Sequence, residues 1–202
     1  MSHDRATVFV SIGYGRGMPI QTTSPLLVAC VCLCAMIASA DHAQAHPLPR
    51  LRPLNVRIAS WLASGYRTSP TLASLVDALE RSDVIVHIGH TAQRDPRIIG
   101  ETQFVTRAGG QRYLRISLDP IVRDHAAIAL LGHELQHAWE IAERPWVIDQ
   151  PTLARLYQEI GRGVDIGYRT HGFDTPAGPD MARRVRAELL SARRLDSRPS
   201  SY

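Results

Sequence analysis

The chain has 202 residues, of which 45% are hydrophobic, 6% aromatic and 21% charged, a balance typical of globular proteins rather than of disordered or collagen-like chains. Its 23 basic residues, all of them arginine, and its 19 acidic residues give a formal net charge of +4, which is too small to predict nucleic-acid binding by itself. The three cysteines lie together at Cys30, Cys32 and Cys34, which excludes a disulfide-stapled mini-protein and a cysteine-ligated zinc finger over the rest of the chain.

The N-terminal region, residues 1–45, is typical of a secretory leader. Residues 26–40 carry no charge; this run is short for a membrane span, which needs about 20 apolar residues, but it suits the apolar core of a signal peptide. Small-x-small cleavage sites follow at residues 38–40 and 43–45. Translation from Met18 would give the leader ordinary proportions. We therefore expect a secreted or periplasmic protein, the alternative being a buried apolar N-terminal helix.

A single domain is expected after the leader, over residues 46–195. Three prolines in residues 46–53 predict an extended segment at its beginning. Residues 196–202 are rich in serine and proline and are predicted to be a disordered tail.

Two helices and a strand are predicted first. The apolar residues in 56–63 favour a helix, although a strand fits them too. Ser69 followed by Pro70 is a strong helix start, and this helix is expected to run to about Arg81. The β-branched residues of 84–88 predict a strand.

A hairpin is predicted next, with strands over residues 102–106 and 112–118 and a turn at Gly109 and Gly110. In its second strand apolar and polar side chains alternate, so one face should be buried and the other should be polar.

A long helix follows the hairpin. Asp119 opens the helical region and Asp124 offers a second N-cap. The helix is expected to extend to about Ala142, because the residue before Pro145 resists helical geometry. One face of this helix is expected to pack on the sheet: Leu131, Leu135, Ala138 and Ala142.

The C-terminal part is predicted to be helical apart from one loop. A helix over residues 151–160 should end at Gly161, residues 162–178 should form a loop, and a last amphipathic helix should cover residues 180–194. Its inward-facing residues are expected to be Met181, Val185, Leu189 and Leu190. The order of elements predicts an α+β fold, with helices packed on a small, mostly antiparallel sheet.

The long helix contains the sequence HELQH at residues 133–137. His133 and His137, at positions i and i+4, lie one turn apart on one helix face, so both imidazoles can reach a single ion. Glu134 lies about 100° round the helix from His133. There its carboxylate can hold and deprotonate a metal-bound water without being a ligand itself. The motif therefore predicts a metal site with Glu134 as general base.

This helix, preceded by a hairpin strand, resembles the HExxH helix of the zincin metallopeptidases. The resemblance implies a zincin-like domain, a bound Zn²⁺ and hydrolysis of peptide bonds in peptide or protein substrates. It also implies that the strand before the helix, residues 112–118 here, lines the cleft and pairs with an extended substrate. Two alternatives stay open: a catalytically inactive exported zincin-like binding or structural domain, and two surface histidines beside a glutamate on a solvated helix.

The sequence leaves the third metal ligand open, and catalytic zinc usually has three protein ligands. Metzincins continue as HExxHxxGxxH, but Glu140 and Glu143 stand at the Gly and third His positions here. Gluzincins take a glutamate from a later helix, which would be Glu159. Asp174 lies in a partial match to the aspzincin GTxxxD pattern, and its surroundings resemble secreted bacterial proteins with a GHELQHA-type helix.

On that resemblance Asp174 is the expected third ligand. Glu140 lies at i+7 from His133, and we expect it to support a ligand rather than to bind the metal. His171 or Tyr168 can donate a hydrogen bond to the oxyanion that forms on attack, although both also fit as ordinary loop residues. No nucleic-acid partner and no membrane contact after leader removal are expected, and the sequence does not indicate an oligomeric state.

Overall fold

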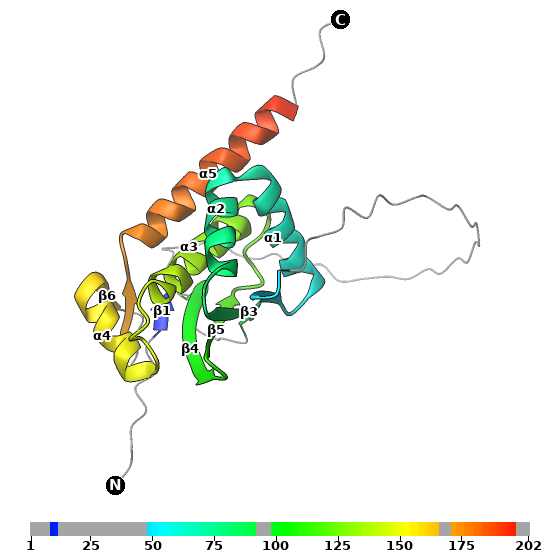
Figure 1. Cartoon of the computed structure of the whole chain (residues 1–202). Coiled ribbons are helices and arrows are strands. Elements are labelled where there is room, and N and C mark those ends of the chain that lie inside the picture. The colour runs from blue at the N-terminus through cyan, green and yellow to red at the C-terminus, as the bar shows by residue number, and fades with distance from the viewer. Residues whose placement is uncertain (1–8, 12–47, 92–97, 166–170, 197–202) are drawn as a thin grey trace, which may run out of the picture.

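The computed structural model describes residues 9–11, 48–91, 98–165 and 171–196, whose course is shown in Figure 1. The described helices are α1 (Val56–Thr68), α2 (Pro70–Glu80), α3 (Asp124–Ala142), α4 (Gln150–Ile160) and α5 (Ala177–Asp196). The described strands are β1 (Phe9–Ser11), β2 (Leu51–Pro53), β3 (Val84–His90), β4 (Gly100–Ala108), β5 (Gln111–Leu118), β6 (Arg162–Asp165) and β7 (His171–Asp174). This composition confirms the predicted α+β class.

Side-chain caps explain where three of the helices begin. Asn55 and Ser69 each accept a hydrogen bond from the backbone N–H three residues further on, at 3.0 and 3.1 Å, and so begin α1 and α2. Asp149 and Thr152 form a reciprocal capping box at the start of α4, and Gly161 is the C-cap of that helix. The predicted helices in these regions are therefore confirmed, with α1 longer than expected.

The start of α3 differs from the prediction. Its N-cap is Arg123, which makes no side-chain cap hydrogen bond. Asp124 is the first helical residue and has a φ of 53°, a conformation that aspartate tolerates better than most residues. Asp119 instead accepts a hydrogen bond from the backbone N–H of Ile121 at 2.8 Å and closes a turn ahead of the helix. The predicted end at Ala142 is confirmed.

The sheet is mixed, so the prediction of a mostly antiparallel sheet is wrong. Its strand order is β2-β3-β5-β4-β1-β7-β6. β3 is parallel to β2 because α1 and α2 form a crossover between these two strands. β3 is also parallel to β5, because the chain reverses direction in β4 before it enters β5. β4 and β5 form the predicted antiparallel hairpin, whose turn residues Gly109 and Gly110 have positive φ values.

The region predicted as a loop, residues 162–178, contains two strands and the beginning of α5. β6 and β7 pair in antiparallel fashion, with Gly163 opposite Phe173. The prediction failed here because the strands have only four residues each and contain glycine, which weakens a strand pattern in the sequence.

The short strand β1 lies between the hairpin of β4 and β5 and the hairpin of β6 and β7. Val10 pairs with Thr102 in antiparallel fashion and with Phe173 in parallel fashion. The sequence assigns these residues to the leader. The apolar core of that leader and its cleavage sites lie outside the described residues, as does the predicted C-terminal tail after Asp196, so removal of the leader stays a prediction.

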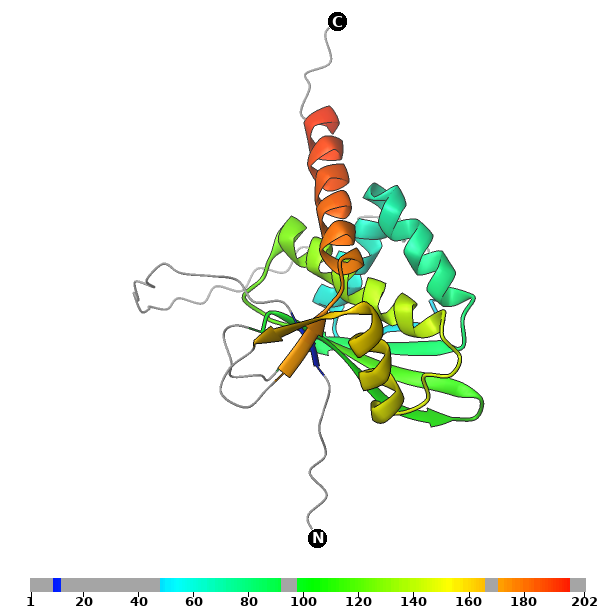
Figure 2. The ribbon, with the colours of Figure 1, turned by 90° about the vertical axis from the view of Figure 1, so that its left-hand side faces the viewer.

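α3 is the central helix of the fold. It contacts β3, β4 and β5 on one side and α1, α2 and α5 on the others, and Figure 2 shows α3 and α5 on the same side of the sheet. Of the face predicted to pack on the sheet, Leu131, Leu135 and Ala138 are fully buried and Ala142 is half-buried. Polar side chains in the middle of this helix are therefore taken out of water.

α5 packs along α3 through one stripe of side chains. Met181, Val185 and Leu189 are buried as predicted, but Leu190 is 40% exposed, because it lies about 100° round the helix from Leu189. Among the described residues, none of the helices has the length and apolar character that a membrane crossing requires.

Candidate metal centre

Four side chains with metal or proton chemistry meet beneath the N-terminal end of α5. His133, Glu134 and His137 come from the middle of α3 and are fully buried. Asp174 is the last residue of β7 and its side chain is 20% exposed. The structure thus brings together the two histidines and the aspartate expected as third ligand, although 36 residues lie between His137 and Asp174 in the sequence.

The three ligand groups offer atoms that all lie within 4.8 Å of one another. Asp174 Oδ1 is 3.3 Å from His133 Nε2 and 3.5 Å from His137 Nε2. Tetrahedral zinc with bonds of about 2.0–2.1 Å places its ligand atoms about 3.4 Å apart. The two histidine Nε2 atoms are 2.8 Å apart, so they would separate by about half an ångström around an ion.

The second nitrogen of His137 has its own partner. Nδ1 lies 2.9 Å from Glu140 Oε2, and Glu140 Oε1 accepts a hydrogen bond from Thr175 Oγ1 at 2.6 Å. When His137 is neutral, proton donation from Nδ1 to Glu140 leaves the lone pair of Nε2 directed at Asp174 and His133. Glu140 therefore supports His137, in the role expected for it, and Thr175 ties this support to the residue that follows Asp174.

Two further elements fix the position of α3 at the site. The Tyr157 hydroxyl of α4 donates to the backbone carbonyl of His137 at 3.4 Å, and the two rings meet edge to face. A Cβ on Gly178 of α5 would lie 2.7 Å from the ring of His133. Glycine is therefore required there for α5 to approach His133 this closely.

Glu134 has one oxygen engaged and one oxygen free. Thr102 Oγ1 on β4 donates to Oε2 at 2.8 Å and also lies 3.2 Å from the backbone carbonyl of Glu134. Oε1 has no hydrogen-bond partner among the described residues. A Cβ on Gly100 would come within 2.4 Å of Oε1, so this glycine of β4 leaves space for the free oxygen.

Unsatisfied polar atoms gather at this site. Within the described part of the chain, His133 Nδ1, Glu134 Oε1 and Asp174 Oδ1 are buried and lack a hydrogen-bond partner. Each such atom costs free energy of roughly 1–3 kcal/mol unless a ligand or water satisfies it. Asp174 Oδ1 is also the oxygen that faces both histidines. Its chemistry and position fit a cation.

Charges at the site are strongly coupled. Burial raises the pKa of Glu134 to about 8. Burial works to lower the pKa of His137, but the neighbouring carboxylates of Asp174 and Glu140 outweigh it and raise that pKa to about 9. Burial would raise the pKa of Asp174, but the imidazoles of His133 and His137 beside Oδ1 outweigh it and hold that pKa well below its usual range. A metal would displace the proton from His137, because only a neutral imidazole can ligate.

Burial lowers the pKa of His133, the opposite direction to His137. His133 is therefore the imidazole that is already neutral and ready to accept a cation. The pair thus combines one neutral ring and one charged ring beside a carboxylate.

The remaining predicted site residues have different outcomes. Glu159 does not join the cluster: its side chain is 58% exposed and pairs with Arg155 across one helical turn, because α4 turns Leu153, Leu156 and Tyr157 inward instead. Tyr168 lies outside the described residues. His171 begins β7, and the orientation of its side chain is likewise outside what the structure describes.

The prediction that residues 112–118, now β5, pair with an extended substrate is wrong. β5 is paired on both sides, with β3 and with β4, so it has no free edge for a substrate. β4 borders the site instead, through Thr102 and Gly100, and its outer edge pairs with β1. The hairpin strand nearest in sequence to the HExxH helix is thus not the one that hydrogen-bonds to Glu134.

Sequence reasoning missed Thr102, Tyr157 and Thr175. Thr175 directly follows Asp174, and this position next to an expected ligand could have indicated that it supports the site. Thr102 and Tyr157 carry no signal in the sequence, since their roles arise only when β4 and α4 pack against α3.

Comparisons with protein-family models, with curated proteins and with solved structures found no match for this chain. The geometry of the cluster is therefore the basis for the function proposed below.

Proposed function

We propose that this protein is an exported zinc-dependent metallopeptidase of the zincin type. The observation that carries the proposal is the convergence of His133 Nε2, His137 Nε2 and Asp174 Oδ1, together with the free carboxylate oxygen of Glu134, the residue next to His133 on α3. Two imidazoles and one carboxylate are a donor set of catalytic zinc sites, which leave a fourth position open. Zinc, when bound there, would polarise the scissile carbonyl and make its water more acidic.

Glu134 supplies the proton transfers. Thr102 holds Oε2, so the carboxylate is oriented with Oε1 free to take a proton from the attacking water. The water oxygen bonds to the carbonyl carbon, the carbon–nitrogen bond breaks, and Glu134 passes its proton to the leaving amine. Burial raises the pKa of this carboxyl, while a bound cation acts in the opposite direction, so the two effects together suit a base that works near neutral pH.

Other residues keep this arrangement in place. Glu140 and Thr175 set the orientation of the His137 ring, and Tyr157 and Gly178 fix α3 against α4 and α5. Positioning of this kind is a large part of catalysis at metal sites, because a misplacement of about 1 Å can cost on the order of a hundredfold in rate.

The decisive experiment compares zinc content and peptide cleavage in the purified protein and in Glu134→Gln. We expect about one zinc per chain in both proteins. The rate at which unfolded protein or mixed peptides are cleaved should be about 10²–10⁴-fold lower in the variant. Glu143→Gln is the matched control, because Glu143 caps the C-terminal end of the same helix and is exposed. It should retain both properties.

Two results would contradict the proposal. Stoichiometric zinc without cleavage of any peptide would favour the inactive exported binding domain. Absence of zinc after purification and after addition of zinc salts would remove the metal-based account altogether.

A further inference from the structure

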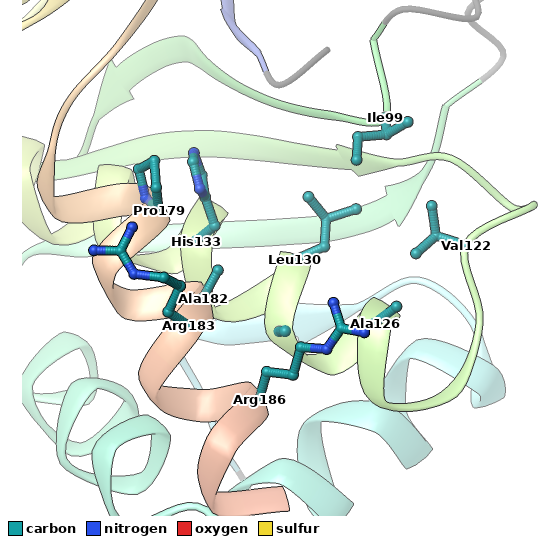
Figure 3. Close-up of a pocket in the computed structure, with 10 residues that line it drawn as sticks. Ile99, Val122, Ala126, Leu130, His133, Pro179, Ala182, Arg183 and Arg186 are labelled. Atoms are coloured by element: carbon teal, nitrogen blue, oxygen red, sulfur yellow. The ribbon is translucent and has the colours of Figure 1, made fainter. Parts of the chain in front are cut away.

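An apolar recess of about 430 Å³ opens between α3 and α5 beside His133. Figure 3 shows its residues: Ile99, Leu130 and Val122 lie on one side, the guanidinium of Arg186 reaches from α5 to a position next to Ala126, and Arg183 lies further along α5 near Pro179. We call it the α3–α5 recess. Its lining consists of Ile99, Val122, Ala126, Ala129, Leu130, His133, Pro179, Ala182, Arg183 and Arg186.

The recess is built from one stripe of each helix. The α3 stripe has residues 126, 129, 130 and 133, and the α5 stripe has residues 179, 182, 183 and 186. Both sets follow the i, i+3, i+4, i+7 spacing of a single helix face. Small residues, Ala126 and Ala129 on α3 and Ala182 on α5, keep the two stripes from filling the space between them. The α3 stripe ends at His133, so the recess leads directly to the metal site.

The two arginines give the recess a positive rim. Arg183 is paired with Asp180 across one turn of α5, so its charge is already compensated. Arg186 is exposed and forms no ion pair with any of the described residues. A guanidinium beside an apolar wall favours a ligand that combines an apolar group with a carboxylate, which it can bind by charge-assisted hydrogen bonds.

We infer that the α3–α5 recess selects peptide substrates that place an apolar side chain in the recess and a carboxylate against Arg186. This inference rests on the proposed function for its biological meaning. Because His133 lines both the recess and the metal site, the apolar side chain belongs to a residue next to the bond that is cleaved. The carboxylate is either the free C-terminus of the peptide or the side chain of a neighbouring aspartate or glutamate.

Binding of small probes tests the inference without requiring turnover. N-acetyl-leucine, N-acetyl-leucinamide and N-acetyl-leucyl-aspartate α-amide, whose side-chain carboxylate is free, are titrated into the purified protein and into Glu134→Gln, with NMR chemical shifts as the readout. We expect at least one of the two carboxylate probes to bind about tenfold more tightly than the leucinamide. The probe that does so identifies the carboxylate as terminal or as a side chain. Equal binding of all three probes would overturn the inference.

Charge variants on α5 separate the arginine from the metal, which can itself attract a carboxylate. Arg186→Gln should remove the tenfold preference while leaving zinc content unchanged. Arg193→Gln is the matched control, since Arg193 is an exposed arginine of the same helix outside the recess, and it should keep the preference. Retention of the preference in Arg186→Gln would overturn the role of this residue.

A shape variant tests the apolar part of the recess. Ala126 is exposed, so Ala126→Leu should narrow the mouth without disturbing the core. We expect weaker binding of N-acetyl-leucine by about tenfold but unchanged binding of N-acetylglycine. Ala187→Leu, at an exposed position of α5 outside the recess, should change neither. Equal loss for both probes, or no loss, would contradict a pocket for the side chain. These binding results stand whether or not the protein cleaves peptides, so failure of the proposed function is distinguishable from failure of the recess.

Discussion

α3 carries two buried polar clusters that differ in how completely their hydrogen bonds are satisfied. At its C-terminal end, Arg112 of β5 is 1% exposed and donates to the backbone carbonyls of Ile141, Ala142, Arg144 and Val147. It also binds both carboxylate oxygens of Asp83, at 2.8 and 2.6 Å. In the middle of the same helix, the HExxH cluster leaves three buried polar atoms without partners among the described residues.

This difference separates a structural cluster from a functional one. The carbonyls at the end of a helix carry partial negative charge and lack intrahelical donors. A single guanidinium with five donors satisfies them and fixes α3 against the sheet. Burial removes the polar atoms of the HExxH cluster from water, but no protein group replaces the lost hydrogen bonds. This is the expected state of groups whose missing partner is a ligand. The predictions below test this contrast, in order of decreasing effect.

Removal of Arg112 should have the largest effect on stability. Arg112→Met would leave buried carbonyls at the end of α3 without donors, and we expect the free energy of unfolding to fall by about 3–5 kcal/mol. Urea titration measures it. Arg115→Met is the matched control, because Arg115 is exposed on the same strand, and its effect should stay within about 0.5 kcal/mol. A loss below about 1 kcal/mol for Arg112→Met would refute the structural role.

Zinc should stabilise the protein through the second cluster alone. At free zinc a hundredfold above the dissociation constant, the free energy of unfolding should rise by about 2.7 kcal/mol. His137→Ala should abolish this gain, because it removes a ligand. Arg112→Met should keep the gain in its folded fraction. Thermal unfolding with and without zinc measures this gain in the wild type and in the two variants. An equal gain in all three proteins would show that the ion binds elsewhere.

Loss of the support beneath His137 should have a smaller effect. Glu140→Gln removes the carboxylate that accepts from His137 Nδ1, and supporting residues of this kind typically change metal affinity by about 10–100-fold, or roughly 1.4–2.7 kcal/mol. Competition with a chelator of known affinity measures the change. Glu143→Gln should leave the affinity unchanged, and an unchanged affinity in Glu140→Gln would mean that Glu140 does not orient the ligand.

The smallest effect on stability is expected when low pH protonates Asp83, the partner of Arg112. The hydrogen bond from Arg112 is the main cause that lowers the pKa of Asp83 from its ordinary 3.8, against a smaller opposing effect of burial. The stability from this pair is therefore complete above that ordinary value and is lost as the pH falls through the lower folded pKa. Because Asp83 is 42% exposed, the loss should be about 1 kcal/mol or less.

Comparison of the wild type with Asp83→Asn between pH 6 and pH 2 isolates this contribution. The gap in unfolding free energy should narrow as the pH falls below about 4. A constant gap over the whole range would contradict the ion pair.

The sequence predicted the helices better than the sheet, for physical reasons. Helix limits depend on local signals, such as Ser69 before Pro70 and Gly161 after α4, and the structure confirms these. Sheet order depends on pairing between distant segments, which no local pattern encodes. The parallel pairing of β3 with β5, and the pairing of β7 with β1, could not be read from alternation of side chains.

The site divides in the same way. His133 and His137 are one helical turn apart, so their spacing alone predicted a shared face, and it placed the adjacent Glu134 about 100° round the helix from His133. Asp174 was reached through a resemblance, and the structure places its carboxylate beside the two histidines. Thr102 and Thr175, which hold Glu134 and Glu140, became visible only after β4 and β7 had been placed against α3.

Anomalous diffraction at the zinc absorption edge, from crystals grown with zinc, tests the central claim most directly. The account predicts one peak within about 2.0–2.2 Å of His133 Nε2, His137 Nε2 and Asp174 Oδ1, and its disappearance in His137→Ala. A peak ligated by Glu140 or Glu159 in place of Asp174 would contradict the assigned ligand set. A zinc-loaded crystal without any peak between the two histidines would contradict the metal centre itself.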